Sequence, residues 1–291
     1  MVGIFVGLMT ALSWAVGSIM MRDLSRKLDP ITLNAPRSLV GGLLMLVLVL
    51  VTGQQGGYAT ITPLQLLFMV GSMLVGGGIG DTFYVTSLSR IGVARAFPIA
   101  SIYPALTLVL GVLILTEIVS LSIVGGLVLV IVGVVLISRI SSGVVIDPHH
   151  QTPAGGVSFA LGAAAFWAIS ILMLAPGIEG HSAVVVSSIR VPALSLALWA
   201  IVAVRGSWRT LLTLSRREWG VLLVGGLIGW GLGSILFVVT VSLLGPTQAA
   251  ILTSTSPMFA LPLSALVLRE RINAHVWVGT ALTVCGIILV T

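Results

Sequence analysis

Three charged side chains lie inside long apolar stretches of the sequence: Arg37, Asp81 and Arg190. An ionised group at the centre of a membrane-spanning helix costs about 2.5 to 3.5 kcal/mol, so each needs a compensating interaction. Arg37 and Asp81 lie at nearly the same depth of their stretches, and we expect them to form an ion pair. Arg190 has no such neighbour, and its two-pronged guanidinium is suited to bind a carboxylate or phosphate of a substrate. The alternative is that both arginines cap neighbouring helix ends or extend to lipid headgroups.

Polar and aromatic residues form a second group with binding potential. Ser101 and Pro104 share one face of an apolar stretch at helical spacing, and the later run TQAAILTSTSP is dense in hydroxyl and amide groups. Pro104 and Pro257 interrupt helical hydrogen bonding, and polar, broken helices commonly line cavities. The alternative is that hydroxyls join neighbouring helices and aromatic rings anchor at the membrane interface. We expect a substrate cavity lined by Trp14, Tyr84, Ser101, Tyr103, Trp167, Gln248, Ser254 and Thr255.

The same residues argue against catalysis and against metal binding. Gly78–Asp81 reads GIGD and resembles the GxGD motif of intramembrane aspartyl proteases, but that chemistry needs two carboxylates sharing a proton. The other aspartates lie in loops, and the four histidines show no HExxH pattern. Glu117 and Glu270 end their apolar stretches, where we expect structural roles. We predict no catalytic residue, no cofactor and no metal site.

The elements that position these residues follow from composition. Of 291 residues, 57% are hydrophobic and only 8% are charged, far below the roughly 25% of soluble domains. A span takes roughly 20 apolar residues, and none of the stretches alternates as a transmembrane barrel strand does. We therefore predict an all-α integral membrane protein with ten transmembrane helices, over residues 3–21, 31–52, 64–88, 93–115, 118–138, 155–175, 183–204, 219–243, 247–268 and 272–290.

The two halves of the chain match without a gap at a spacing of 153 residues. Trp14 then meets Trp167, Arg37 meets Arg190, and Asp81 meets Ser234, which leaves Arg190 without the acidic partner expected for Arg37. Pro104 and Glu117 likewise meet Pro257 and Glu270, and chance would rarely align Trp, Arg, Pro and Glu together. Each repeat has five spans, an odd number, so the second copy enters the membrane from the opposite side. The prediction is a 5+5 inverted-topology repeat: residues 1–140, a connecting loop 141–154, and residues 155–291.

Together these motifs resemble the two EamA domains of the drug/metabolite transporter superfamily: Ser13–Trp14 and Phe166–Trp167, Arg37 and Arg190, Pro104 with Glu117, and Pro257 with Glu270. The resemblance covers essentially the whole chain and implies a ten-helix carrier, often an exporter of amino acids, nucleobases or other small metabolites. The predicted function is a secondary transporter that exports small polar metabolites by alternating access between the inverted halves. The alternative is an intramembrane enzyme acting on a lipid or peptide.

Loop charges predict how the chain is inserted. Loops after the odd-numbered spans hold twelve Lys or Arg with their margins, and loops after the first four even-numbered spans hold none. By the positive-inside rule both termini lie outside, in a multi-pass protein of the cell membrane. Members of the resembled family usually have both termini inside, so the uncharged loop 53–63 departs from their pattern. The expected partners are a small-molecule substrate and the bilayer, not nucleic acid. Proton coupling through Asp81 or Glu117 and the oligomeric state stay open.

Overall fold

The computed structural model describes residues 1–21, 24, 27–91, 96, 99–140, 153–256, 258–260, 263 and 274–290. The predicted site residues Pro257 and Glu270, and all but the end of the predicted loop 141–154, lie outside these residues. The described elements are all helical: α1 (Val2–Met21), α2 (Pro30–Val51), η2 (Gln54–Thr60), α3 (Pro63–Met73), η3 (Leu74–Gly80), α4 (Asp81–Ile91), α6 (Tyr103–Leu115), α7 (Leu121–Ile140), α8 (Pro153–Ile178), α9 (Ala183–Arg205), α10 (Trp208–Leu211), α11 (Arg216–Gly226), η4 (Leu227–Leu232), α12 (Gly233–Thr253) and α14 (Ala274–Val290).

The long apolar helices confirm an α-helical membrane protein. Within the described residues six helices are long and apolar enough to cross a bilayer, and three further apolar helices are shorter. The sixth covers Arg216–Thr253 and bends at Gly245, whose φ of 80° and ψ of 168° are not helical. This bend falls where the sequence separates its eighth and ninth spans. Helical residues occupy part or all of each of the ten predicted stretches, while ten complete crossings stay a prediction.

Short capping motifs explain why the helices begin and end where they do. Thr62 accepts a hydrogen bond from the backbone N–H of Gln65, whose side chain accepts one from the Thr62 backbone, and α3 starts there. Ser215 begins α11 with the same reciprocal motif. Gly53 and Gly206 follow α2 and α9 with φ of 68° and 66°, the left-handed conformation that glycine adopts without strain. These two glycines are 153 residues apart, so α2 and α9 end in the same way in the two copies of the repeat.

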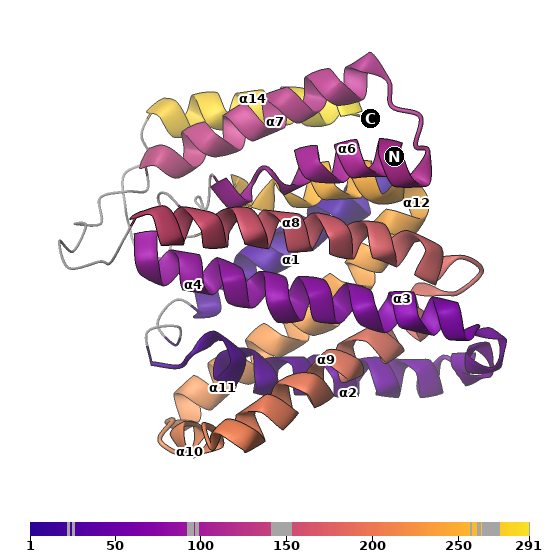
Figure 1. The fold of residues 1–291 in the computed structure, drawn as a ribbon, viewed down its shortest axis with the longest axis vertical. Helices are drawn as coiled ribbons and strands as arrows, with labels where there is room; N and C mark the ends of the chain where they lie inside the picture. Colours follow the sequence, from indigo (N-terminus) through magenta and orange to yellow (C-terminus); the bar gives the residue numbers. More distant parts are fainter. Residues whose placement is uncertain are drawn as a thin grey trace.

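Helix packing joins the two halves in matching pairs. Helix α2 packs on α9, α7 packs on α14, α1 packs on α12, and α8 packs on α3 and α4 (Figure 1). A methyl group at Gly80 would lie 2.8 Å from Cδ1 of Trp167, and one at Gly233 would lie 2.8 Å from Cδ1 of Trp14. A shift of 153 residues converts one contact into the other. The helix that carries each tryptophan therefore meets the opposite half in the same way.

The contact between α7 and α14 is reciprocal as well. A methyl group at Gly126 would lie 2.6 Å from the carbonyl oxygen of Gly286, and one at Gly133 would lie 2.5 Å from that of Gly279. Shifting by 153 residues turns Gly126 into Gly279 and turns Gly133 into Gly286, so each contact is the image of the other. Exchange of this kind is what a two-fold axis between the two helices produces. Only glycine permits backbones to come this close.

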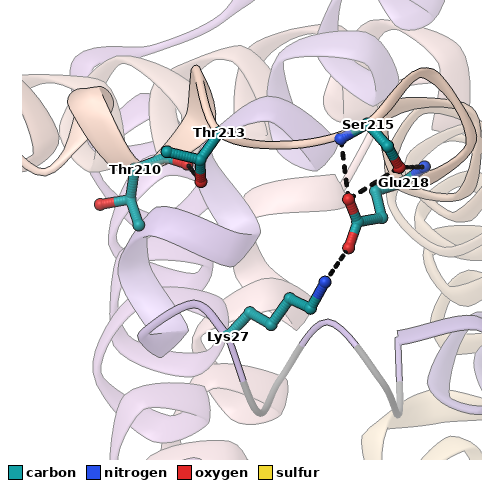
Figure 2. A network of polar contacts seen from close by, with 5 residues as sticks. All are labelled: Lys27, Thr210, Thr213, Ser215 and Glu218. Carbon is teal, nitrogen blue, oxygen red and sulfur yellow. Dashed lines mark hydrogen bonds and ion pairs between the residues drawn. The ribbon is translucent and has the colours of Figure 1, made fainter.

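The two ends of the helix bundle differ in charge. Both chain termini lie at one end, and α10 with the start of α11 lies at the other (Figure 1). The connection after α1 and the start of α11 are joined there by an ion pair between Lys27 and Glu218, and Glu218 also accepts hydrogen bonds from Ser215 (Figure 2). Among the described residues, Lys27 and the arginines of α10 and α11 therefore lie at the end away from the termini.

Candidate functional site

Two π-helical segments interrupt the bundle at equivalent positions. Segment η3 begins at Leu74 and η4 at Leu227, again 153 residues apart. Segment η3 packs against α8 and α9, and η4 packs against α1 and α2. π-Helical turns are rare and frequently mark functional sites. Neither segment was predicted from the sequence, and the glycine-rich runs LVGGGIG and LIGWGL are the signal that could have indicated them.

The residue that follows η3 is Asp81, and it forms no direct ion pair with Arg37. One carboxylate oxygen of Asp81 accepts a hydrogen bond from Nε1 of Trp167 at 2.9 Å. Among the described residues no ion pair joins Asp81 to Arg37 within 4.0 Å, so the predicted pair does not form as a direct contact, although the two opposite charges still attract each other. The side chain of Asp81 turns toward Trp167, and that of Arg37 turns toward Asn34.

Asp81 lies beside a cluster of three aromatic rings that the sequence analysis assigned to a cavity. The ring centroid of Trp167 lies 5.1 Å from that of Tyr84 and 5.7 Å from that of Tyr103. The hydroxyl of Tyr103 donates to the carbonyl of Ala250 at 3.1 Å, which fixes the ring against α12. Helices α4, α6 and α8 thus bring a carboxylate and three rings into one place, which we call the Asp81 cluster: Asp81, Tyr84, Tyr103 and Trp167.

Trp14 has a different aromatic neighbour from Trp167. Its ring centroid lies 5.3 Å from that of Phe237 on α12. Trp14 and Trp167 both pack against the same buried apolar core, which includes Tyr103 and Phe237. The two tryptophans therefore approach one core from opposite halves of the chain.

Arg37 binds a neighbour on its own helix. Its Nη1 donates to Oδ1 of Asn34 at 2.7 Å, and its Nε is buried with no hydrogen-bond partner in the part of the chain that the structure describes. The guanidinium lies against η4, where a methyl group at Gly229 would be 3.3 Å from Nη2. Asn34 was missed by the sequence analysis, although a spacing of three residues places it on the same helix face as Arg37.

Arg190 is more deeply buried than Arg37, with 3% of its surface exposed. Its Nε donates to the hydroxyl of Ser72 at 3.0 Å, and no carboxylate forms an ion pair with it among the described residues. Ser72 is held in place in turn, since its carbonyl accepts a hydrogen bond from Ser170 at 2.5 Å. Ser72 was also missed, because the equivalent position in the repeat is Gly225 and gives no polar signal.

The other predicted cavity residues are buried or bonded to nearby backbone. Ser101 is buried, and Pro104 lies in the first turn of α6, where proline starts a helix instead of interrupting one. The hydroxyls of Ser254 and Thr255 donate to carbonyls three residues earlier, at 2.7 and 2.6 Å. The side-chain amide of Gln248 donates to the carbonyl of Val290 on α14 at 2.8 Å.

Glu117 lies close to Gly245 at the bend of α12, where a methyl group would be 3.1 Å from Oε1 of Glu117. It accepts a hydrogen bond from Thr247 and borders an open cavity of about 740 Å³. Glu179 and His181 line the same cavity. The described residues contain no group of three or more acidic, histidine or cysteine side chains that could hold a metal ion.

These features define an α-helical membrane protein whose contacts repeat at a spacing of 153 residues. The chain belongs to the EamA-like transporter family, whose profile matches residues 1–139 and 154–291. An Archaeoglobus fulgidus protein named "Uncharacterized transporter" is 28% identical over 291 residues, which cover 99% of this chain and 98% of that protein. A solved crystal structure superimposes with a TM-score of 0.77 at 16% identity, covering 99% of this chain and 96% of the other, and this likeness supports the fold.

Proposed function

We propose that the protein is a secondary transporter that exports small polar metabolites, such as amino acids or related compounds. Transport proceeds by alternating access between residues 1–140 and 155–291, inserted as a 5+5 inverted repeat. The reciprocal contacts of Gly126 with Gly286 and of Gly133 with Gly279 carry this proposal. Two halves related by a two-fold axis can exchange conformations, and the exchange converts a site open to one side into a site open to the other.

In this proposal the ten spans leave both termini outside the cell membrane. The location of both termini at one end of the bundle supports an even number of crossings (Figure 1). The gathering of Lys27 and the arginines of α9, α10 and α11 at the opposite end supports the orientation, because cytoplasmic loops carry the excess of cations.

Arg190 is the proposed anchor for an anionic group of the substrate. Its burial, with a serine as its hydrogen-bond partner, leaves the guanidinium charge without an acidic partner among the described residues. A buried guanidinium in this setting favours a carboxylate or phosphate ligand because it offers several donors in a fixed fork. The segment η3 lies next to α9, so the site would sit beside one of the two π-helical turns.

Reconstitution in liposomes tests the proposal. The wild-type protein should give saturable flux of a polar metabolite that unlabelled substrate inhibits, and everted vesicles should accumulate it if the direction is export. Arg190→Gln should abolish the saturable flux at nearly unchanged folded yield. Arg205→Gln, an exposed position on the same helix, is the matched control and should retain the flux.

Two outcomes would contradict this proposal. Linear, unsaturable flux across a broad panel of metabolites would exclude a carrier mechanism. Equal loss of folded yield and of flux in Arg190→Gln would assign Arg190 a structural role in place of substrate binding.

A further inference from the structure

The repeat conserves a tryptophan in each half but changes what surrounds it. Trp167 packs on Gly80, and Trp14 packs on Gly233 in the same way. The residue after the glycine is Asp81 in the first case and Ser234 in the second. The tryptophan–glycine contact therefore forms equally well beside a neutral side chain, and packing alone does not call for a carboxylate.

The two aromatic neighbours of Trp167 change as well. Tyr84 corresponds to Phe237 in the other half, and Tyr103 corresponds to Ser256. The Asp81 cluster thus combines a carboxylate with three rings, whereas the equivalent place holds two rings and no charge. Asp81, Tyr84 and Tyr103 are therefore particular to the first half, and the equivalent packing in the second half forms without them.

The carboxylate of Asp81 has no cation in direct contact in the described part of the chain, although the charge of Arg37 attracts it from beyond ion-pair distance. Within the described residues no lysine or arginine forms an ion pair with it, and Trp167 supplies a neutral N–H donor. Asp81 lies in the candidate membrane span Pro63–Ser87, where an ionised carboxylate is rare and normally finds a cationic partner. Asp81, Tyr84 and Trp167 are each half-buried.

The rings beside the carboxylate favour one kind of cation. The faces of tryptophan and tyrosine attract ammonium groups, most strongly when water is excluded, and several rings around a carboxylate form a cage for substituted ammonium ions. The centroid distances of 5.1 and 5.7 Å gather the rings of Tyr84 and Tyr103 around Trp167. A divalent metal ion would instead require several oxygen ligands, and the cluster offers one carboxylate.

We propose that the Asp81 cluster is a binding site for a substituted ammonium group, with the carboxylate pairing its charge and the three rings covering its alkyl groups. This inference rests on the proposed function in one respect: the ligand is one of the small polar metabolites that the protein transports. Binding itself does not require flux, so the two proposals fail separately.

Isothermal titration of the purified full-length protein in detergent tests the site with choline as the probe. The uncharged carbon isostere 3,3-dimethylbutan-1-ol has nearly the same shape and measures the contribution of the charge. We expect choline to bind at least about tenfold more tightly than the isostere, since cation–π attraction and charge pairing together are worth about 1.4 kcal/mol or more. Asp81→Asn should remove this preference.

Two further variants test whether choline binding depends on the carboxylate of Asp81. Glu179→Gln removes an exposed carboxylate outside the cluster and should leave the affinity for choline unchanged. Asp81→Ser introduces the residue that the other half carries beside its tryptophan, and it replaces Asp81→Asn if the latter does not fold. Absence of choline binding to the wild type, equal affinity for choline and isostere, or an unchanged choline affinity in a folded Asp81 variant would each overturn the proposal.

Discussion

The crossing of α7 and α14 allows a quantitative test of the glycine contacts. In Gly126→Ala the new methyl group would lie 2.6 Å from the carbonyl oxygen of Gly286 and 3.1 Å from the backbone nitrogen of Val290. Both atoms are backbone, and Gly133 makes an equally close contact two turns along α7, so the helices cannot separate at one point alone. Overpacking of this kind costs about 1–3 kcal/mol.

Gly125 provides a control on the same helix. A methyl group at Gly125 meets one atom, Cδ1 of Leu289 at 3.9 Å, which is ordinary contact. Both substitutions replace a helical glycine by alanine and share a gain in helix propensity of about 1 kcal/mol. The difference between the two variants therefore isolates the clash, and Gly126→Ala should be about 1–3 kcal/mol less stable than Gly125→Ala.

Equilibrium unfolding of the two variants in detergent, by titration with a denaturing surfactant, measures this difference. Equal stability of Gly126→Ala and Gly125→Ala would refute the close approach of the two backbones. It would also remove the main support for the two-fold relation between the halves.

Two further predictions concern the ends of the bundle. Ser215→Ala removes the N-cap of α11 and should lower the free energy of unfolding by about 0.5–2 kcal/mol, whereas Lys27→Ala breaks an exposed ion pair and should leave the melting temperature unchanged. A larger loss in Lys27→Ala would contradict this order. In a Cys285→Ala background, Gly56→Cys places a thiol in open space on η2, and a membrane-impermeant maleimide should label it from outside intact cells. Labelling only after permeabilisation would reverse the proposed orientation.

The repeat predicted from the sequence identifies which contacts are equivalent. Trp14 and Trp167 were aligned from the sequence, and in the structure each meets a glycine that the same shift relates. Tryptophan and glycine are informative because a large ring and a residue without a side chain fit together. Such pairs remain recognisable among the many leucines and valines that match by chance.

The partners of the charged residues were less predictable. Depth in the membrane follows from counting residues at 1.5 Å each, but the direction of a side chain around its helix depends on the turns that precede it. The π-helical segment η3 lies directly before Asp81 and changes that direction, so the carboxylate meets Trp167 and not Arg37. The hydrogen bond from Arg190 to Ser72 joins residues 118 apart in sequence, and no local spacing indicates it.

The two π-helical segments give the bundle a way to rotate a side chain without breaking a helix. Each residue of an α-helix turns the chain by about 100°, and a π segment holds one residue in excess of the α-helical register. If η3 passed that residue along into α4, Asp81 would swing by about 100° around the helix axis and leave Trp167. The same register shift in η4 would turn Ser234. In a carrier built this way, one side chain in each half would turn around its helix axis, and the helix would keep its backbone hydrogen bonds before and after the turn.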